Sequence, residues 1–128
     1  MRGTVRREVR INCPADKVWA LVGDAVRIPE WFPGIVEAAV EGDTRTITTG
    51  AGIPMAETFT SDPLQRRFQY RISGGLLQEH VSTLDVIDLG NDTCLVVYSV
   101  DADPNTMALV IGGAAGNALE HLRTLMED

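Results

Sequence analysis

Hydrophobic and polar residues alternate along most of the chain, and this period of two predicts β-strands. The first alternating stretch covers residues 4–13. Six further stretches are bounded by clusters of Gly, Pro, Asn and Asp. They lie at residues 35–41, 44–50, 55–61, 66–73, 79–88 and 93–101. Because the connections between them are short, we expect neighbouring strands to pair antiparallel.

Three segments have the spacing of helices instead. Residues 14–24 and about 25–31 predict two short helices after the first strand. The last stretch, from Pro104 to about Glu127, predicts a long helix with Asp103 as its N-cap. Together these elements predict an α+β fold in which the long helix covers one face of a curved, seven-stranded antiparallel sheet.

The predicted apolar face of the long helix is bulky at its ends and small at its centre. This face holds Met107, Ile111, Ala114, Ala118, Leu122 and Leu125. Taken alone, the pattern fits a helix that covers a cavity and equally a helix that packs closely on a sheet; the alternating connections and the inner polar residues described below favour the cavity. Gly112, Gly113 and Gly116 interrupt the helix without a reason that the sequence supplies.

The connections between the predicted strands are of two kinds. Those at residues 41–43, 61–63 and 89–92 are polar turns, and the glycine-rich, apolar segments at 50–54 and 74–77 alternate with them. Alternate connections of a meander lie at opposite ends of its sheet, so we expect one end to be polar and closed. The apolar loops predict an opening at the other end, next to the start of the long helix.

Four polar residues share the side of the strands that the helix is expected to cover. They are Thr49, Glu57, His80 and Ser82. If the hairpins are symmetrical about their turns, the facing pairs are Glu57 with Tyr70, Tyr70 with Ser82, and Ser82 with Val100. The alternation thus predicts a polar row across the inside of the sheet, with His80 one row nearer the opening.

Glu57 is the most informative single residue, because a carboxylate on an apolar wall is costly unless it is paired, hydrogen-bonded or protonated. It is interpreted as a polar anchor or a general acid/base in a ligand cavity. The alternatives are a glutamate that bonds Tyr70 or water and serves only the fold, and a local bulge that turns it to solvent. His80 is either a histidine at the opening or surface, or a binding residue, and His121 is interpreted as structural.

Charge and composition argue against several other functions. The net charge of −7 argues against a nucleic-acid-binding surface. The two histidines form no metal motif, and no glycine-rich phosphate loop is found, so no metal or cofactor is expected. The absence of a signal region and of a bilayer-spanning apolar run predicts a cytoplasmic protein without stable membrane insertion. Cys13 and Cys94 are interpreted as buried thiols.

Several motifs match a known superfamily. The matching stretches are residues 11–19 (INCPADKVW), 28–34 (IPEWFPG), 70–75 (YRISGG) and the final helix. With the order of elements, they resemble the START/Bet v 1-like (SRPBCC, helix-grip) superfamily in its bacterial polyketide cyclase/dehydrase-like branch. The resemblance covers the whole chain as one domain, residues 1–128. It implies a sheet that grips the C-terminal helix, a hydrophobic cavity between them, and Trp31 near that cavity.

Members of this superfamily bind lipids, sterols, polyketides, plant hormones or quinones. We therefore expect a lipid, a polyketide or another aromatic or isoprenoid molecule between sheet and helix, in a monomer or homodimer. The expected ligand-binding residues are Trp31, Ile47, Met55, Glu57, Phe59, Tyr70, Ser82, Tyr98, Met107, Ile111 and Ala114.

Some members catalyse ring cyclisation or dehydration, so a polyketide cyclase/dehydratase-like enzyme is the alternative. Glu57 or His80 would then move a proton, while Tyr70, Ser82 or Tyr98 would orient a carbonyl. The catalytic candidates are Glu57, His80 and Tyr70. A protein-interaction module is the second alternative. No nucleophile–base pair is evident in the sequence, so we rank ligand binding first.

Overall fold

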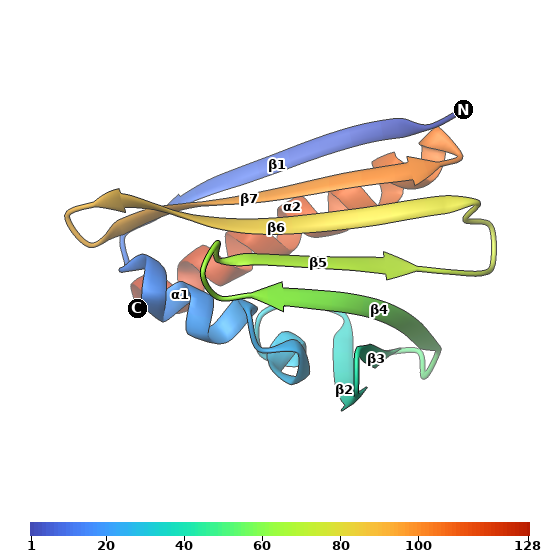
Figure 1. The fold of residues 1–128 in the computed structure, drawn as a ribbon, viewed down its shortest axis with the longest axis horizontal. Coiled ribbons are helices and arrows are strands. Elements are labelled where there is room, and N and C mark those ends of the chain that lie inside the picture. Colours follow the sequence, from blue (N-terminus) through green and yellow to red (C-terminus); the bar gives the residue numbers. More distant parts are fainter.

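The computed structural model describes residues 1–128, and its strands form one antiparallel sheet in the order β1-β7-β6-β5-β4-β3-β2 (Figure 1). The strands are β1 (Gly3–Ile11), β2 (Ile35–Glu41), β3 (Thr44–Thr49), β4 (Pro54–Asp62), β5 (Arg67–Ile72), β6 (Glu79–Gly90) and β7 (Thr93–Asp103). The helices are α1 (Ala15–Val22), the 3-10 helix η1 (Ala25–Glu30) and α2 (Asn105–Glu127). The predicted fold class and order of elements are confirmed.

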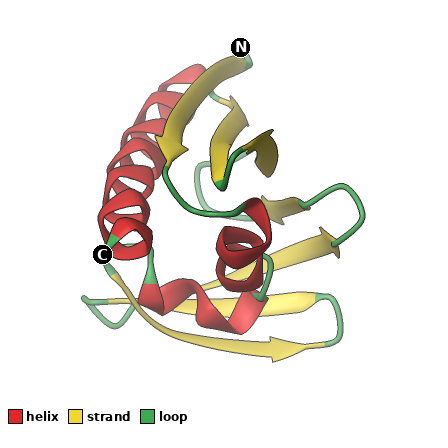
Figure 2. Ribbon diagram, turned by 90° about the vertical axis from the view of Figure 1, so that its left-hand side faces the viewer, coloured by secondary structure: helices red, strands yellow, loops and turns green.

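The sheet curves around a shared interior, with α2 along one side and the two short helices inside the curve (Figure 2). Helix α2 packs against β1 and β7. The core is continuous from β1 through α1 and η1 to the central strands and α2. In β7 every second residue from Cys94 to Ala102 is buried, which confirms the alternation predicted for this strand.

The predicted register is correct in one half of the polar row and wrong in the other. Tyr70 faces Ser82, and Ser82 faces Val100, as predicted. Glu57, however, faces Ile72 instead of Tyr70. The β4–β5 turn begins one residue later than predicted, because Asp62 still belongs to the ladder and its carboxylate accepts turn N–H groups. When the centre of the turn shifts by one residue, the residue that faces Glu57 changes by two positions, from Tyr70 to Ile72. Because side chains alternate with a period of two, Glu57 still points inward.

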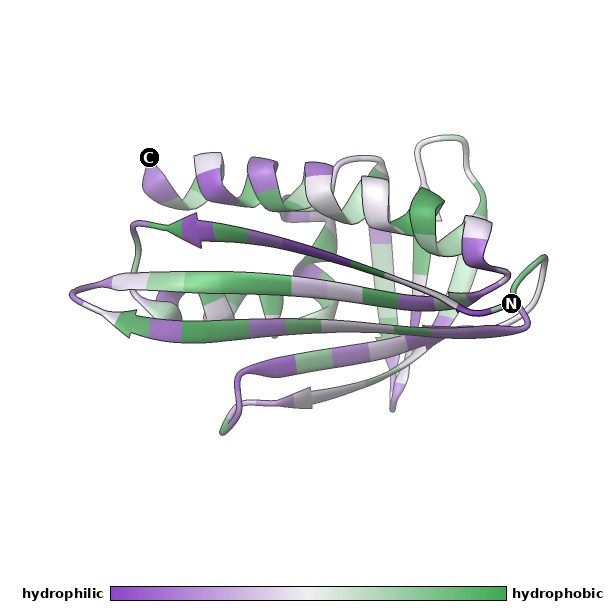
Figure 3. Ribbon diagram, turned by 90° about the horizontal axis from the view of Figure 1, so that it is seen from above, coloured by the Kyte–Doolittle hydropathy of each residue, from purple (hydrophilic) through white to green (hydrophobic).

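The start of α2 differs from the prediction. Asp103 is the last residue of β7 and not the N-cap, and Pro104 precedes the helix without a side-chain cap. The Asp103 carboxylate instead accepts from the N-terminal amine of Met1 at 3.2 Å. Hydrophilic and hydrophobic residues alternate along the C-terminal half of α2, whereas its N-terminal half is mainly hydrophobic after the first turn (Figure 3). None of the helices combines the length and hydrophobicity needed to cross a lipid bilayer.

The covered face of α2 is also rotated from the predicted one. Its buried residues are Ala108, Gly112, Ala115, Ala118, Leu119 and Leu122. Ala114 and Leu125, both predicted to be covered, are exposed, while Met107 and Ile111 are half-buried. The prediction for Ala114 is wrong because alanine and glycine are only weakly hydrophobic and say little about which face of a helix is covered. The predicted face therefore depended on the bulky residues at the two ends of the helix.

Close packing on β1 accounts for one of the three glycines of α2. A Cβ atom at Gly112 would lie 2.5 Å from a methyl group of Val5, whereas one at Gly113 would meet nothing within 4 Å. Gly112 therefore lets the helix backbone lie directly on the side chain of β1. Small residues here serve close packing, the second of the two interpretations of the stripe.

We predict opposite effects for two neighbouring substitutions in α2. Gly112→Ala should lower the free energy of unfolding by about 1–3 kcal/mol, because its methyl group overlaps Val5. Gly113→Ala should raise it by about 0.5–1 kcal/mol, because alanine favours the helix and the position is open. Urea denaturation of both variants measures the difference. Equal effects would contradict the packing described for Gly112.

Candidate functional site

A buried ion pair occupies the inner face of the sheet. Arg45 on β3 and Glu57 on β4 are direct cross-strand partners, and Arg45 Nε donates to Glu57 Oε1 at 2.6 Å. Both side chains are only 2% exposed. The interpretation of Glu57 as a residue turned to solvent by a bulge is therefore wrong. The sequence analysis missed Arg45, although its spacing of two from Ile47 places it on the same inner face.

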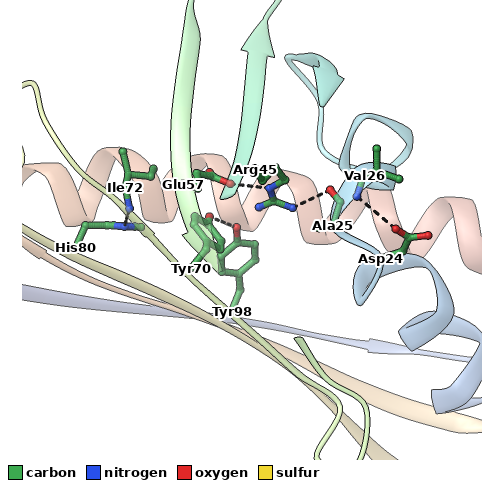
Figure 4. Close-up of polar contacts among 9 residues, drawn as sticks. All are labelled: Asp24, Ala25, Val26, Arg45, Glu57, Tyr70, Ile72, His80 and Tyr98. Carbon is green, nitrogen blue, oxygen red and sulfur yellow. Dashed lines mark hydrogen bonds and ion pairs between the residues drawn. The ribbon is translucent and has the colours of Figure 1, made fainter. Parts of the chain in front are cut away.

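Three elements hold the Arg45 guanidinium in place. Its Nη1 donates to the carbonyl of Ala25 in η1 at 3.1 Å (Figure 4). Asp24 caps η1 by accepting from the N–H of Val26, which fixes the turn that presents this carbonyl. The guanidinium carbon lies 4.9 Å from the ring centroid of Phe68 on β5, so its charge also faces an aromatic ring.

Two phenols lie next to the ion pair. The hydroxyls of Tyr70 and Tyr98 are hydrogen-bonded to each other, and Arg45 lies 5.3 Å from the Tyr70 ring centroid (Figure 4). Burial raises the pKa of Tyr70, and burial raises that of Tyr98 well above its usual value. The negative charge of Glu57 acts in the same direction on both pKa values. The two phenols therefore stay neutral at physiological pH and can donate or accept hydrogen bonds.

His80 is buried, so its interpretation as a surface histidine is wrong. Its Nδ1 accepts from the backbone N–H of Ile72 at 2.9 Å, just beyond the last paired residues of β5 and β6. Its Nε2 lies 2.8 Å from Ser82 Oγ and carries the ring proton, because Nδ1 is the acceptor. Burial, together with the positive charge of Arg71, lowers the pKa of His80 to about 4.

Burial raises the pKa of Glu57, and the contact with Arg45 opposes that rise. Neither Glu57 nor His80 is a free base, because Glu57 is paired with a guanidinium and both ring nitrogens of His80 are engaged. In the alternative interpretation, Glu57 bonds Tyr70 or water and serves only the fold; in the structure, its carboxylate accepts from Arg45 instead. These groups can orient a ligand, but the geometry does not present a proton acceptor to it.

Two buried donors in this region have no partner. They are Trp31 Nε1 and Arg45 Nη2. A buried donor left unpaired costs about 1–3 kcal/mol, so such atoms are uncommon in folded proteins. Trp31 is 3% exposed, and its ring packs 6.5 Å from that of Tyr98. Both unpaired donors thus belong to side chains that surround the two phenols.

The structure places most of the expected ligand-binding residues around one interior. Trp31, Ile47, Glu57, Tyr70, Ser82 and Tyr98 are buried. Met55, Phe59, Met107 and Ile111 are half-buried, and Ala114 is exposed on α2. Five principal pockets lie on the surface, and none of them is lined by a residue of α2. No group of three or more His, Cys, Asp or Glu side chains is positioned to hold a metal ion.

A long C-terminal helix gripped by a curved seven-stranded antiparallel sheet defines the helix-grip fold of the START/Bet v 1-like superfamily. Within it, the chain belongs to the family described as polyketide cyclase / dehydrase and lipid transport, whose model matches residues 2–127. No curated protein matches the sequence.

Solved structures share this fold at low sequence identity. An uncharacterised protein from Bacillus thuringiensis is 20% identical with a TM-score of 0.90, and the match covers 98% of this chain and 100% of that one. XoxI from Bacillus cereus is 21% identical with a TM-score of 0.91, over 98% and 96% of the two chains. Norcoclaurine synthase from Thalictrum flavum, in complex with dopamine and hydroxybenzaldehyde, is 19% identical with a TM-score of 0.73, over 98% and 86%.

The lowered pKa of His80 predicts a pH-dependent stability. The unfolded chain binds more protons than the folded one between pH 6.5 and about 4. The free energy of unfolding should therefore fall as the pH drops through this window, by up to about 2 kcal/mol after allowance for solvent screening. His80→Asn keeps an acceptor near the N–H of Ile72 and should reduce the fall. Denaturant unfolding across this pH range measures it.

The exposed His121 supplies the matched control for this prediction. The His121→Asn variant should lose stability with falling pH as the wild type does. If His80→Asn also retains the full fall, His80 is not the group responsible.

The ion pair predicts a non-additive effect on stability. Glu57→Gln leaves the buried guanidinium without its counter-charge and should cost about 3–5 kcal/mol in the free energy of unfolding. Replacing both residues by methionine should cost much less than the two single changes together, because no unpaired charge remains. Chemical denaturation of Glu57→Gln, of each single methionine variant and of the double variant gives the four values. A loss below about 1 kcal/mol for Glu57→Gln, typical of exposed pairs, would contradict the description.

Proposed function

We propose that the protein binds a small hydrophobic molecule that carries a neutral hydrogen-bond acceptor, in the interior between the sheet and α2. The observation that carries the proposal is the pair of buried, unpaired donors, Trp31 Nε1 and Arg45 Nη2. A ligand carbonyl, ether or hydroxyl oxygen would accept from such a donor and remove the penalty of leaving it unpaired. The family description, which includes lipid transport, agrees with a hydrophobic ligand.

The walls of the interior favour an apolar, partly aromatic ligand. Phe59 and Phe68 are stacked with centroids 5.3 Å apart, and Phe32 packs edge-on against Tyr98. Flat aromatic surfaces of this kind bury planar rings well. Norcoclaurine synthase, which shares the fold, is in complex with two small aromatic molecules, dopamine and hydroxybenzaldehyde, and the second of them carries a neutral carbonyl group.

The charge balance of the site favours a neutral ligand over an anionic one. The positive charge of Arg45 is already matched by Glu57 at 2.6 Å. A ligand carboxylate would add a second negative charge to a buried region that holds one cation, and it would also lose its hydration. A carbonyl oxygen accepts the same hydrogen bond without either penalty.

A cyclase-like enzyme is the second candidate, and the Tyr70–Tyr98 pair beside Arg45 favours it. Neutral phenols and a guanidinium can polarise a ligand carbonyl and stabilise developing negative charge. The role proposed for these residues is polarisation, because Glu57 and His80 are both engaged by other groups. Both candidate functions require that the protein bind a ligand with a carbonyl group.

Three ligands of similar size and shape separate the contributions of acceptor and charge. Methyl naphthyl ketone should bind at least about tenfold more tightly than naphthoate, which is anionic, and than ethylnaphthalene, which has no acceptor. Isothermal titration calorimetry measures all three affinities. Equal affinities for ketone and carboxylate would contradict the charge argument, and failure of the ketone to bind would overturn the proposed function.

Two tryptophan variants test the donor directly. Trp31→Phe removes the unpaired Nε1 and should weaken ketone binding by about 1 kcal/mol, close to fivefold, while binding of ethylnaphthalene changes little. Trp19→Phe is the matched control for equilibrium affinity, because Trp19 on α1 is the other tryptophan and its Nε1 is not one of the two unpaired donors. If both variants weaken the ketone equally, the Nε1 donor of Trp31 is not the contact.

A further inference from the structure

A groove of ≈ 640 Å³ opens beside the site, between the short helices and the strands β2 and β4. Its apolar lining residues are Trp19, Ala20, Ala25, Val26, Val40 and Phe59. Val40 is 41% exposed and Val26 48% exposed, so the groove presents apolar surface to solvent. Exposed apolar surface of this kind, set in a concavity, is suited to contact a hydrophobic molecule.

The groove adjoins the buried ion pair through three of its lining residues. Val40 is the cross-strand partner of Arg45, so both side chains lie on the same face of the sheet. The Ala25 carbonyl accepts from Arg45 Nη1 at 3.1 Å. Phe59 stacks on Phe68, whose ring faces the guanidinium. Exposure falls from 41% at Val40 to 2% at Arg45 across one pair of strands.

The two walls of the groove are held in different ways, one by close packing and a hydrogen bond and the other by ring stacking alone. The Trp19 ring lies so close to Gly23 that a Cβ atom there would approach it to 2.5 Å. Ser61 Oγ donates to the Gly23 carbonyl at 2.8 Å and ties the end of α1 to β4. Phe59 lies opposite, half-buried, and is held by ring stacking without any polar contact.

We propose that this groove is the entrance through which the hydrophobic ligand reaches the interior, and that rotation of Phe59 opens it. The inference rests on the proposed function and adds the route to the site. The end of the sheet where the apolar loops predicted an opening holds a groove of ≈ 680 Å³ that is lined mainly by polar and charged residues, among them Arg2, Arg71 and Asp101. A hydrophobic molecule has less to gain there than along the groove beside η1.

The entrance can be tested by attaching a bulky, removable group to a cysteine introduced at either end of the molecule. Val26→Cys places a thiol in the groove, and Ile53→Cys places one in the β3–β4 loop at the other end. A bulky methanethiosulfonate reagent should modify only the new thiol, because Cys13 and Cys94 are buried and burial raises the pKa of Cys94 to about 11. Stopped-flow fluorescence with Nile red, a neutral hydrophobic dye, then gives association and dissociation rates.

Blocking a route slows binding and release equally and leaves the equilibrium unchanged. Modification of the Val26→Cys variant should lower both rates by about tenfold and change Kd by less than about twofold, and reduction of the mixed disulfide should restore both rates. The same treatment of the Ile53→Cys variant should leave the rates unchanged.

Three results would overturn the entrance. Slower rates only in the modified Ile53→Cys variant would place the route at the loop end. A weaker Kd with an unchanged association rate after modification of Val26→Cys would make the groove a binding site and not a route. Absence of Nile red binding to the unmodified protein would remove the proposed function, and the entrance with it.

Discussion

The buried contact between Arg45 and Glu57 is the interaction on which the interior depends. Two charges that lose their hydration are tolerated only if they pair closely and their remaining polar atoms find partners. Arg45 meets this requirement through the Ala25 carbonyl and the Phe68 ring, so the charge ties β3 to η1 and to β5. The same requirement stays unmet at Nη2, and the proposed preference for a ligand with an acceptor rests on this atom and on Trp31 Nε1.

The polar groups of the interior fall into two sets with different roles. Around His80, each ring nitrogen has a partner, and the imidazole takes the place of the next ladder contact where β5 and β6 separate. Around Arg45 and Trp31, donors remain unused. The first set therefore maintains the sheet, and the second is available to a ligand. A buried glutamate and a buried histidine on one face of a sheet suggest acid–base chemistry until their partners are known.

Much of the fold follows from the alternation of residues, whereas the details that define the site do not. Period-two patterning fixes which side of β4 faces inward, so Glu57, Tyr70 and Ser82 could be predicted as interior residues. Arg45 was not predicted as an interior residue, because an arginine on a threonine-rich strand is expected to face solvent unless its ion-pair partner is known. The covered face of α2 was predicted incorrectly because Gly112 lies on it for steric reasons: only glycine leaves room for Val5. A pattern of hydrophobic residues contains no information on such a steric fit.

The contact of Gly112 with Val5 has a mechanical consequence. Because the backbone of α2 rests directly on a side chain of β1, the helix and this edge of the sheet behave as one stiff body that cannot move closer together. Any change of interior volume must then come from the other side of the sheet, where β2, β3 and β4 curl away from α2 (Figure 2). If a molecule binds in the interior as proposed, the space for it must come from a shift of these three strands, with the helix as a fixed surface.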